Sequence, residues 1–347
     1  MFSKLRSLIF KFDPETAHNL AIKSLKLNFF TSAFDETKND EIFQTTLFGK
    51  KIDNPIGIAA GFDKNAEIYN PLFKLGFGFV EVGTITPLPQ YGNPKPRVFR
   101  LEEDQALINR LGFNNLGAQD ANFRIRSNVP NGVLGINIGP NMDTKDRLKD
   151  YLVCLRKFHD VADYITINIS SPNTENLRDF HDQSNLDQLI RVLENEKKNL
   201  KSKVPLVVKI SPDILNEQIK PIIEILLKYE IRGVIVSNST EECRDELKNV
   251  SKYQKGGLSG KPLENKSNEL INKFYNSMKN KIQIIGVGGV DSGESAYKKF
   301  LAGANYIQLY TGMVYKGPNI VSIIKKELKE ILDKKGIKNF RDIIGQK

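Results

Sequence analysis

Tryptophan and cysteine are scarce in this sequence: tryptophan is absent from the 347 residues, and cysteine occurs twice. Cys154 and Cys243 stand far apart, outside any CxxC or Cys/His spacing, so the pattern indicates neither a disulfide framework nor a zinc site. Two thiols without a pairing pattern fit a reducing cytosol better than an exported protein. We expect no bound metal, and a chain of this length builds a core without covalent staples.

Long hydrophobic runs are also missing, and no apolar stretch reaches the ~20 residues that a membrane-spanning helix needs. The N-terminus, MFSKLRSLIFKF, has a basic start but only the short run Leu8–Phe10 before Lys11, with no small-residue cleavage site. It therefore differs from a signal peptide. A missing span still allows a protein to lie on a membrane surface.

Acidic residues are outnumbered, because 51 Lys and Arg against 41 Asp and Glu give a formal net charge of +10. A lysine-rich soluble surface is the usual meaning of such an excess. Attraction to anionic lipid or to nucleic acid is a sharper alternative, and the charge alone does not choose between them. With 40% hydrophobic and 27% charged residues, the composition is that of a globular protein.

The first 30 residues predict two short amphipathic helices. Asp13-Pro14 between them supplies an N-cap followed by proline at the first helical position. Five basic residues against two acidic ones give this piece a charge of 5 − 2 = +3. A polar linker, Thr31–Asp40, is expected to follow. The apolar positions at helical spacing are Leu5, Leu8, Ile9 and Phe12, then Ala17, Leu20, Ala21 and Leu25.

From residue 50 onward, short β-branched runs alternate with amphipathic helical stretches. Runs that are apolar on both faces and alternate with helices indicate a parallel sheet covered on both sides, and eight of them favour a closed (β/α)₈ TIM barrel, an α/β fold. The predicted strands are Ile56–Ala60, Phe79–Val82, Val133–Ile138, Tyr164–Ile169, Leu206–Ile210, Gly233–Val236, Ile282–Gly286 and Tyr306–Leu309. Helices are expected at Leu148–Val161, Leu186–Leu200, Ile214–Tyr229 and Ser292–Leu301. The long segment 87–113 predicts an inserted hairpin, with strands Val98–Leu101 and Ala106–Ile108.

Polar and glycine-rich residues follow all eight predicted strands, where the active site of such a barrel lies. The strand ends read AAGFDK, EVGT, GINIG, NISSPN, VKIS, VSNST, GVGG and QLYTG. Gly286, Gly288 and Gly289 after the seventh strand and Tyr310-Thr311-Gly312 after the eighth match the usual barrel phosphate site. GVGG by itself is more often only a tight turn, so the prediction of a phosphate site depends on its position after the seventh strand.

Two lysines and five asparagines at these strand ends indicate a ligand. Lys209 lies among Val207, Val208 and Ile210, and burying an ammonium there is costly unless it meets an anion. A salt bridge at the rim is the alternative for it and for Lys64. A lone asparagine at such a place is usually an Asx turn. Five carboxamides together favour a planar amide ligand: Asn109, Asn137, Asn168, Asn173 and Asn238.

At these residues the sequence resembles the dihydroorotate dehydrogenase family. AAGFDKN, EVGTITPLPQYGNPKPRVFRL, INRLGFNN, GINIG, INISSPNTENLR, VKISPD, GGLSGKPL, IIGVGG and QLYTGMVYKGP occur in the family's order from about residue 50 to 320. The resemblance implies an FMN-binding barrel that oxidises dihydroorotate to orotate, the fourth step of de novo UMP synthesis.

The same resemblance assigns site residues by motif. Ser171 in NISSPN corresponds to the catalytic base, at a position where soluble relatives carry cysteine. The implied FMN contacts are Ala60, Gly61, Thr84, Asn137, Asn168, Lys209, Ser237, Gly260, Gly289, Tyr310 and Thr311. The implied contacts of the substrate are Lys64, Asn109, Arg110, Leu111, Gly112, Phe113, Asn168, Asn173, Asn238 and Ser239.

The N-terminal helices with DPETAH resemble the element that forms a quinone tunnel and a membrane contact in the quinone-reducing class. Without that resemblance, His18 would be interpreted as a solvated or core histidine. The implied tunnel residues are His18, Val98, Arg100 and Tyr310. We expect residues 1–40 to form the cap and linker, and 41–347 the barrel with a C-terminal helical tail, Leu328–Gly345. A monomer bound to anionic lipid at the cytoplasmic face of the inner membrane, without a nucleic-acid partner, is the resulting prediction.

Three rival interpretations remain. A soluble dihydroorotate dehydrogenase would use fumarate or NAD, against which Ser171 and the helical cap argue. A flavin barrel that acts on tRNA would use the positive charge for phosphate contacts, but no RNA-binding module is visible. A non-catalytic barrel would be colourless when purified.

Overall fold

Eight parallel strands close into a barrel in the computed structural model of the chain, which describes residues 2–27 and 40–347. The predicted fold class, an α/β (β/α)₈ barrel, is confirmed. Around the barrel the order is β10-β12-β13-β3-β4-β7-β8-β9, which is the sequence order of the strands once the circle is closed. The strands are β3 (Ile56–Ile58), β4 (Phe79–Ile85), β7 (Val133–Ile138), β8 (Tyr164–Asn168), β9 (Leu206–Lys209), β10 (Gly233–Val236), β12 (Gln283–Val287) and β13 (Tyr306–Leu309).

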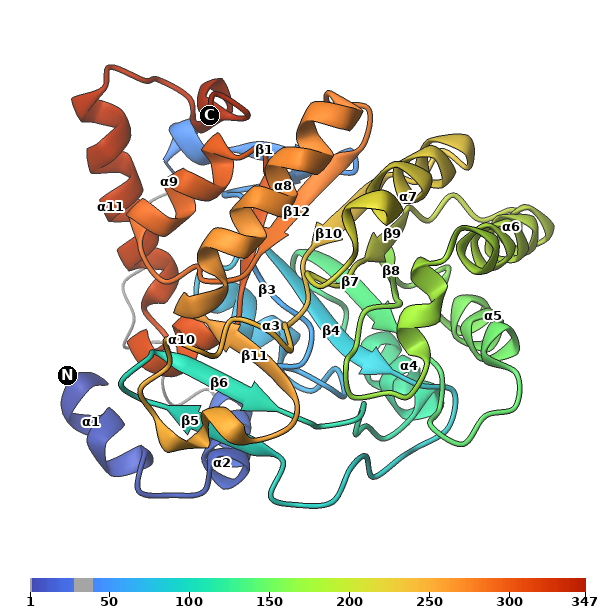
Figure 1. Cartoon of the computed structure of the whole chain (residues 1–347), viewed down its shortest axis with the longest axis horizontal. Coiled ribbons are helices and arrows are strands. Elements are labelled where there is room, and N and C mark those ends of the chain that lie inside the picture. Colours follow the sequence, from blue (N-terminus) through green and yellow to red (C-terminus); the bar gives the residue numbers. More distant parts are fainter. Residues whose placement is uncertain (1, 28–39) are drawn as a thin grey trace.

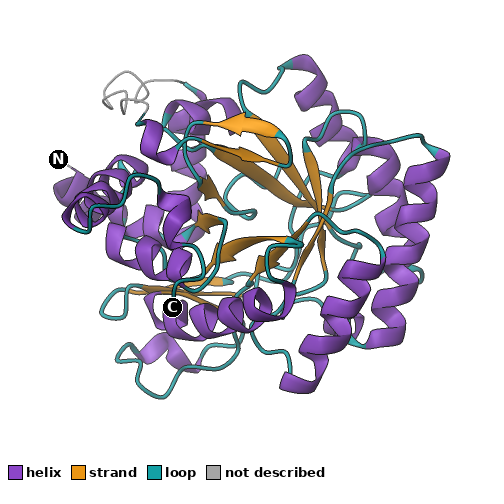
Figure 2. Cartoon of the chain, turned by 90° about the horizontal axis from the view of Figure 1, so that it is seen from above, coloured by secondary structure: helices purple, strands orange, loops and turns teal. Residues whose placement is uncertain are grey.

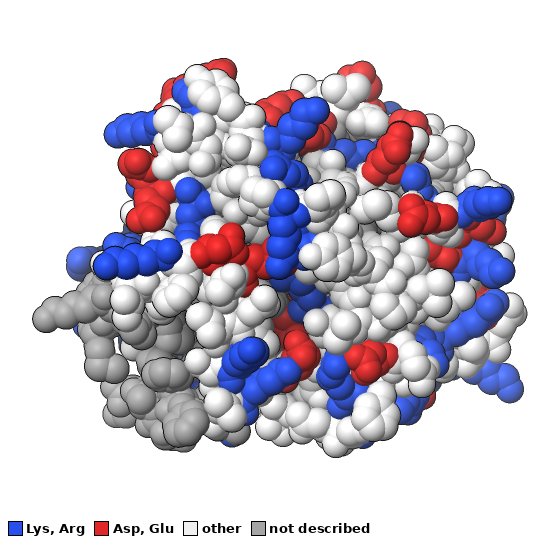
Figure 3. All heavy atoms as spheres, turned by 90° about the horizontal axis from the view of Figure 1, so that it is seen from below, with Lys and Arg blue, Asp and Glu red and all other residues white. Residues whose placement is uncertain are grey.

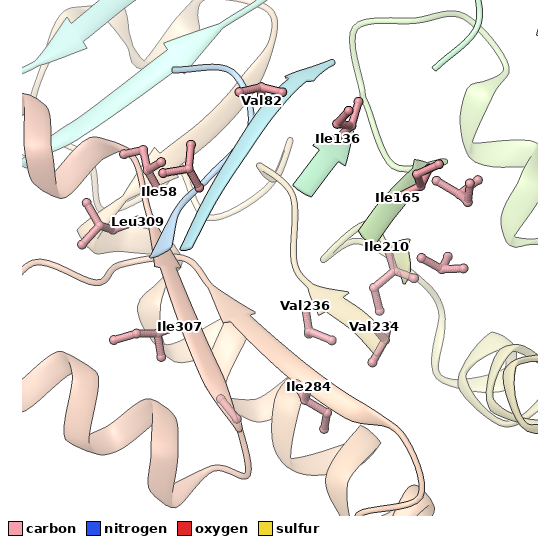
Figure 4. Packing of buried hydrophobic residues seen from close by; sticks show 14 of the residues in the cluster. Ile58, Val82, Ile136, Ile165, Ile210, Val234, Val236, Ile284, Ile307 and Leu309 are labelled. Carbon is pink, nitrogen blue, oxygen red and sulfur yellow. The ribbon is translucent and has the colours of Figure 1, made fainter. Parts of the chain in front are cut away.

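Helices cover the outside of the barrel, as the view along the strands shows (Figure 2). They are α3 (Tyr69–Lys74), α4 (Ala118–Ser127), α5 (Arg147–Phe158), α6 (Gln183–Asn199), α7 (Asn216–Lys228), α8 (Glu264–Met278), α9 (Gly293–Leu301), α10 (Thr311–Lys316) and α11 (Ile320–Lys334). Outward strand residues such as Ile136, Ile165 and Val234 pack against them in one continuous hydrophobic cluster (Figure 4). The burial of this layer removes apolar surface from water and stabilises the closed sheet.

The inside of the barrel changes from apolar to polar along the strands. At the N-terminal ends, Phe79, Tyr164 and Tyr306 form a second hydrophobic cluster with the hairpin of β1 (Thr45–Leu47) and β2 (Lys50–Ile52). Two residues further along β4 and β8, the buried residues are Glu81 and Thr166. Since side chains alternate between the faces of a strand, these polar groups also point inward.

A three-stranded antiparallel sheet, ordered β11-β6-β5, lies beside the barrel. Strands β5 (Val98–Leu101) and β6 (Ala106–Asn109) form a hairpin within the predicted insertion, and β11 (Gly257–Gly260) pairs with β6. The sequence analysis did not predict β11, because GGLSG is typical of a turn and its partner lies about 150 residues earlier. This sheet brings the segment after β10 next to the insertion after β4.

The N-terminal helices are α1 (Phe2–Ile9) and α2 (Pro14–Lys26), and Asp13 caps α2 by accepting from the N–H groups of Glu15 and Thr16, each at 3.0 Å. Figure 1 shows both at one edge of the molecule, next to β5 and β6. The face of α2 buried on the barrel consists of Ala17, Ile22 and Leu25, whereas Leu20 is 47% exposed. The predicted apolar stripe is therefore wrong in part, because the helix is rotated toward Ile22. The predicted linker 31–40 lies outside the described residues except for its last residue.

The C-terminal segment packs on the barrel helices. After α11, the turn η5 (Phe340–Ile343) buries Phe340 against Phe300 of α9, with ring centroids 5.2 Å apart. The N–H of Gly345 donates to the carbonyl of Phe300 at 3.0 Å. Short 3₁₀ turns complete the fold: η1 (Glu41–Phe43), η2 (Leu177–His181), η3 (Val250–Tyr253) and η4 (Lys261–Leu263).

Candidate active site

One cavity at the carboxyl ends of the barrel strands collects most of the predicted site residues. Its empty volume is about 1320 Å³ when the open mouth is counted. Walls come from seven strand ends and from β6 and β11. The predicted residues that line it are Ala60, Gly61, Lys64, Thr84, Val98, Asn109, Leu111, Gly112, Phe113, Asn168, Ser171, Asn173, Lys209, Ser237, Asn238, Ser239, Gly260, Gly289, Tyr310 and Thr311.

Four predicted site residues do not line this cavity. Asn137 lies below its floor, fully buried in the barrel. Arg110 points outward, where its guanidinium donates to Gln254 Oε1 at 3.0 Å and stacks over the ring of Phe99 at 4.7 Å. Its side chain is thus engaged away from the cavity. The other two, His18 and Arg100, lie at the junction with the N-terminal helices.

The floor of the cavity is a chain of buried hydrogen bonds. Thr84 Oγ1 donates to Asn137 Oδ1 at 2.6 Å, and Asn168 Nδ2 donates to both oxygens, at 3.0 Å to Thr84 and 3.1 Å to Asn137. Asn137 Nδ2 in turn donates to Glu81 Oε1 at 2.8 Å. Because a buried polar group must be paired, these contacts fix the side chains of the floor in one arrangement.

Lys209 reaches the floor from the end of β9 and is 5% exposed. Burial lowers the pKa of its ammonium, and the charge of Glu81 acts in the opposite direction. Among the described residues, none accepts a hydrogen bond from its Nζ. A buried ammonium with its donors available inside a cavity is suited to an anionic or electron-rich ligand edge.

One end of the cavity combines a glycine loop with the start of a helix. Gly288 and Gly289 have positive φ angles of 119° and 76°, which glycine adopts without strain. A Cβ on Gly289 would stand 2.5 Å from Cβ of Glu264, so only glycine fits. Next to this loop, Thr311 begins α10, whose first turn leaves N–H groups without intrahelical acceptors. Such N–H groups at a helix start bind anions.

The other end collects carboxamides and hydroxyls. Asn173 Nδ2 lies 3.3 Å from Asn109 Oδ1 and donates to it, while Asn238 Nδ2 donates to Ser170 Oγ at 2.9 Å. Ser239 N–H donates to Asn238 Oδ1 at 2.8 Å. These donors and acceptors come from three different loops. Together they can complement the alternating C=O and N–H groups along the edge of a planar cyclic amide.

Lys64 and Ser171 complete this end. Burial lowers the pKa of Lys64 to about 8, although the nearby carboxylate of Glu15 raises it in part. Ser171 is 5% exposed, and its Oγ accepts from the N–H of Asn173 at 3.2 Å. Both residues line the same cavity, and an ammonium and a hydroxyl there can serve a carboxylate and a carbon-bound proton of one ligand.

The N-terminal helices contact this end of the cavity through polar side chains. Arg97 Nε and Nη2 donate to the two oxygens of Glu15 at 3.1 and 2.6 Å. Arg100 lies over the ring of Phe10 at 4.5 Å and donates to the carbonyls of Phe10 and Phe12. Of the four predicted tunnel residues, Val98 and Tyr310 line the cavity. Arg100 instead binds the backbone carbonyls of the loop between α1 and α2.

Sequence reasoning missed Glu81, which is fully buried inside the barrel. Glu81 belongs to the strand end EVGT, but the sequence analysis assigns it no role. The same argument that singled out Lys209, a charged residue among apolar neighbours of a buried strand, applies to Glu81 between Val80 and Val82 and would have found it.

This combination, a (β/α)₈ barrel with a phosphate-type glycine loop and a polar cavity at the carboxyl ends of its strands, defines a barrel enzyme of the cofactor-binding kind. The family model for Dihydroorotate dehydrogenase matches residues 42–332. The chain belongs to the dihydroorotate dehydrogenase family, and the predicted family is confirmed.

Similar proteins cover nearly the whole chain. A dihydroorotate dehydrogenase (quinone) of Bartonella tribocorum is 45% identical over 343 residues, which span 97% of this chain and 94% of the relative. One of Buchnera aphidicola subsp. Schizaphis graminum is 44% identical, covering 93% and 98%. The crystal structure of DHODH from Eimeria tenella in complex with ferulenol has a TM-score of 0.92 at 37% identity, covering 96% of this chain and 95% of that one. The predicted enzyme class, an oxidoreductase of the quinone type, is thereby confirmed.

Proposed function

We propose that this protein oxidises dihydroorotate to orotate in pyrimidine synthesis, with FMN bound in the cavity and a membrane quinone as the final electron acceptor. The observation that carries the proposal is that Lys64, Ser171 and Lys209, from three different strand ends, line one cavity together with the predicted asparagines. Relatives that align over nearly their full length are quinone-type dihydroorotate dehydrogenases.

The residues of the cavity fit FMN. The glycine loop at Gly288 and Gly289, with the N–H groups at the start of α10, would hold the phosphate. Ser237, Thr84 and Asn168 would position the ring, and Lys209 would place an ammonium against its electron-rich edge. When bound, FMN supplies the hydride acceptor that no protein side chain provides.

The chain's own residues bind and orient the substrate. Lys64 holds the carboxylate of dihydroorotate, and the amides of Asn109, Asn173 and Asn238 hold its ring. Ser171 Oγ takes the proton from C5 while the hydride leaves C6. A serine hydroxyl is a weak base, so the proton must pass on through a hydroxyl or water relay. Orientation of the substrate supplies much of the rate.

The N-terminal helices would lead the quinone in and touch the membrane. Four of their apolar side chains are largely exposed: Leu8 56%, Phe12 47%, Leu20 47% and Leu27 66%. No helix in the described part of the chain is long and apolar enough to span a membrane. An exposed apolar stripe with basic neighbours is suited to the interface of an anionic bilayer instead.

Charged side chains of both signs on the N-terminal helices are engaged within the protein, since Glu15 pairs with Arg97. Lys26 pairs with Glu67 at 2.5 Å, and Arg6 donates to the carbonyl of Tyr315 at 3.1 Å, so both are engaged within the protein. On the face shown in Figure 3, basic and acidic side chains are intermingled. The apolar side chains, rather than the charge, should therefore dominate the membrane contact. The cytoplasmic face of the inner membrane and a monomeric state stay predictions.

The test of the proposed reaction is an absorbance spectrum of the purified protein before and after anaerobic addition of dihydroorotate. Bleaching of a flavin band would support both cofactor and substrate. A colourless protein, or a flavin that dihydroorotate leaves oxidised, would contradict the proposal. Turnover with fumarate or NAD in place of quinone would assign the soluble class.

The membrane contact is tested separately with Leu8→Ser, Phe12→Ser and Leu20→Ser combined. These side chains are exposed, so the barrel should stay intact while binding to anionic vesicles and turnover with a lipophilic quinone fall. Leu215→Ser is the control, because Leu215 is 57% exposed next to α7, away from the N-terminal helices. Equal vesicle binding by the triple variant and the control would contradict the membrane contact.

A further inference from the structure

Glu81 is the carboxylate at the centre of the barrel, directly below the cavity floor. It is fully buried, and four neutral groups donate to it. Oε2 accepts from Tyr164 OH at 3.0 Å, Thr166 Oγ1 at 3.2 Å and Gln308 Nε2 at 3.0 Å, while Oε1 accepts from Asn137 at 2.8 Å. Such complete pairing is what allows a carboxylate to stay buried.

This carboxylate sets the direction of the hydrogen bonds above it. An ionised carboxylate only accepts, so Asn137 must turn its amide nitrogen down toward Glu81 and its oxygen up. The oxygen then accepts one hydrogen bond from Thr84 Oγ1 and one from Asn168 Nδ2. The orientation of two cavity-lining side chains therefore depends on a charge that does not itself touch the cavity.

Glu81 also acts on the charge of Lys209. The β8–β9 register places Lys209 beside Asn168, which donates to Asn137, the residue that donates to Glu81. Burial favours a neutral lysine, and Glu81 is the one charged group among the described residues that is found to oppose this effect. The negative charge below and the ammonium above thus form a pair separated by a layer of neutral hydrogen bonds.

We propose that Glu81 is a positioning residue that keeps Lys209 protonated and fixes the hydrogen-bond direction of Asn137, Thr84 and Asn168, so that the pair tunes how readily bound FMN accepts electrons. The inference rests on the proposed function, since it needs FMN in the cavity. It adds a group that acts through these four residues and contacts neither substrate nor cofactor.

Glu81→Gln tests the proposal, because glutamine keeps the shape and removes the charge. Its oxygen would take the place of Oε2, facing three donors, and its amide nitrogen would then face Asn137 and force that side chain to turn over. Lys209 would lose its proton more easily. Because the protonation of Lys209 is coupled to reduction of the flavin, the midpoint potential should show an alkaline break in its pH dependence.

The measurement is the flavin midpoint potential from pH 6 to 10. In Glu81→Gln the alkaline break should lie at a pH lower than in the wild type by about one unit or more, the usual effect of losing a nearby opposite charge. If the wild type shows no break up to pH 10, the variant should show one within this range. Tyr164→Phe is the matched control, since it removes one donor to Glu81 but keeps the charge. It should retain the wild-type profile. In Lys209→Met the break should be absent whether residue 81 is Glu or Gln.

An unchanged break in Glu81→Gln, or an equal shift in Tyr164→Phe, would overturn the inference. If Glu81→Gln does not fold, Glu81→Asp carries the test: its shorter side chain withdraws the charge, so the break should move in the same direction by less, and an unmoved break would also overturn it. A wild-type protein without flavin would instead contradict the proposed function, so the two failures can be told apart.

Discussion

The ring of His18 and the ammonium of Lys64 meet where the N-terminal helices join the barrel, with Nε2 and Nζ 3.4 Å apart. The ring is parallel to Tyr310 at 6.5 Å and stands edge-on to Phe62 at 5.2 Å. Burial and the charge of Lys64 keep the pKa of His18 well below its usual range, so the ring is neutral and a ring nitrogen is available to accept a hydrogen bond from the lysine. Helix α2 therefore packs against a wall of the cavity through His18, which is compatible with both the tunnel residue and the core histidine considered in the sequence analysis.

The activity should fall above pH 8 because of Lys64. Its pKa is lowered to about 8, mainly by burial, and only the ammonium can pair with the substrate carboxylate. Below about pH 8 the free enzyme carries the charge. Above it, kcat/KM for dihydroorotate should fall by about tenfold per pH unit, mostly through KM.

Glu15→Gln sharpens this test, since Glu15 is the charge that most raises the pKa of Lys64. In that variant the alkaline fall should begin at lower pH. A flat kcat/KM up to pH 10, or a profile that Glu15→Gln leaves unmoved, would remove Lys64 as the carboxylate partner.

Ser171→Ala should slow flavin reduction by dihydroorotate about 10²–10⁴-fold at neutral pH, the usual contribution of a general base. FMN should remain bound, because Ser171 Oγ contacts only the N–H of Asn173 among the described residues. Stopped-flow bleaching of the flavin measures the step directly. Ser259→Ala is a useful comparison, since Ser259 lies in the same cavity but bonds to Thr311 Oγ1 at 2.9 Å, toward the phosphate end. Rates near wild type in Ser171→Ala would exclude it as the base.

Local sequence patterns predicted the barrel because each strand is a short β-branched run with polar residues at its end. The strand bounds agree to within about three residues, as for Ile56–Ile58 and Gln283–Val287. The third strand of the added sheet was missed, since Gly257–Gly260 has no strand propensity and forms only because β6 offers it a partner. Such pairing depends on distant residues, which local patterns do not contain.

Side-chain directions were the second limit of the sequence. Motifs placed Arg110 beside Asn109, but successive residues of a strand point to opposite faces. Asn109 therefore lines the cavity while Arg110 stacks on Phe99 outside it. The role of Asn137 as a floor residue likewise depends on Glu81 beneath it, and that contact depends on the register between two neighbouring strands, which the sequence pattern did not specify.

The ion pair of Glu15 with Arg97 should be the main polar anchor of the N-terminal helices. Arg97 is 3% exposed, and its guanidinium also donates to the carbonyls of Tyr91 at 2.6 Å and Asn93 at 2.9 Å. Glu15→Ala would leave a buried charge without its carboxylate, which typically costs about 3–5 kcal/mol. We expect faster proteolysis within residues 1–27 and weaker turnover with quinone.

Lys26→Ala is the matched control, since Lys26 also joins α2 to the barrel, through Glu67, but its side chain is 44% exposed. A surface pair contributes only about 0–1 kcal/mol. Equal protease sensitivity of the two variants would show that the helices are held by their apolar face alone.

The stability of the protein should rise with pH because of Lys299. This lysine is fully buried behind the glycine loop, where it donates to Asn268 Oδ1 at 2.9 Å and Ser267 Oγ at 3.1 Å. Burial lowers its pKa to about 7, against the opposing charge of Glu264. In the unfolded chain its pKa returns to the ordinary value near 10.5. Between these values the unfolded state binds more protons, so the free energy of unfolding increases with pH.

Lys299→Met removes this dependence. Below pH 7 the wild type bears the full cost of a buried ammonium, about 5 kcal/mol for a pKa lowered by about 3.5 at about 1.36 kcal/mol per pKa unit. The variant should therefore exceed the wild type in free energy of unfolding by the largest amount at or below pH 7. This difference should decrease progressively toward pH 10. Urea unfolding at several pH values measures the difference. Lys298→Met is the control, because that side chain is 50% exposed, 3.7 Å from Glu264. Parallel curves for wild type and Lys299→Met across this range would mean that Lys299 titrates normally, despite its burial.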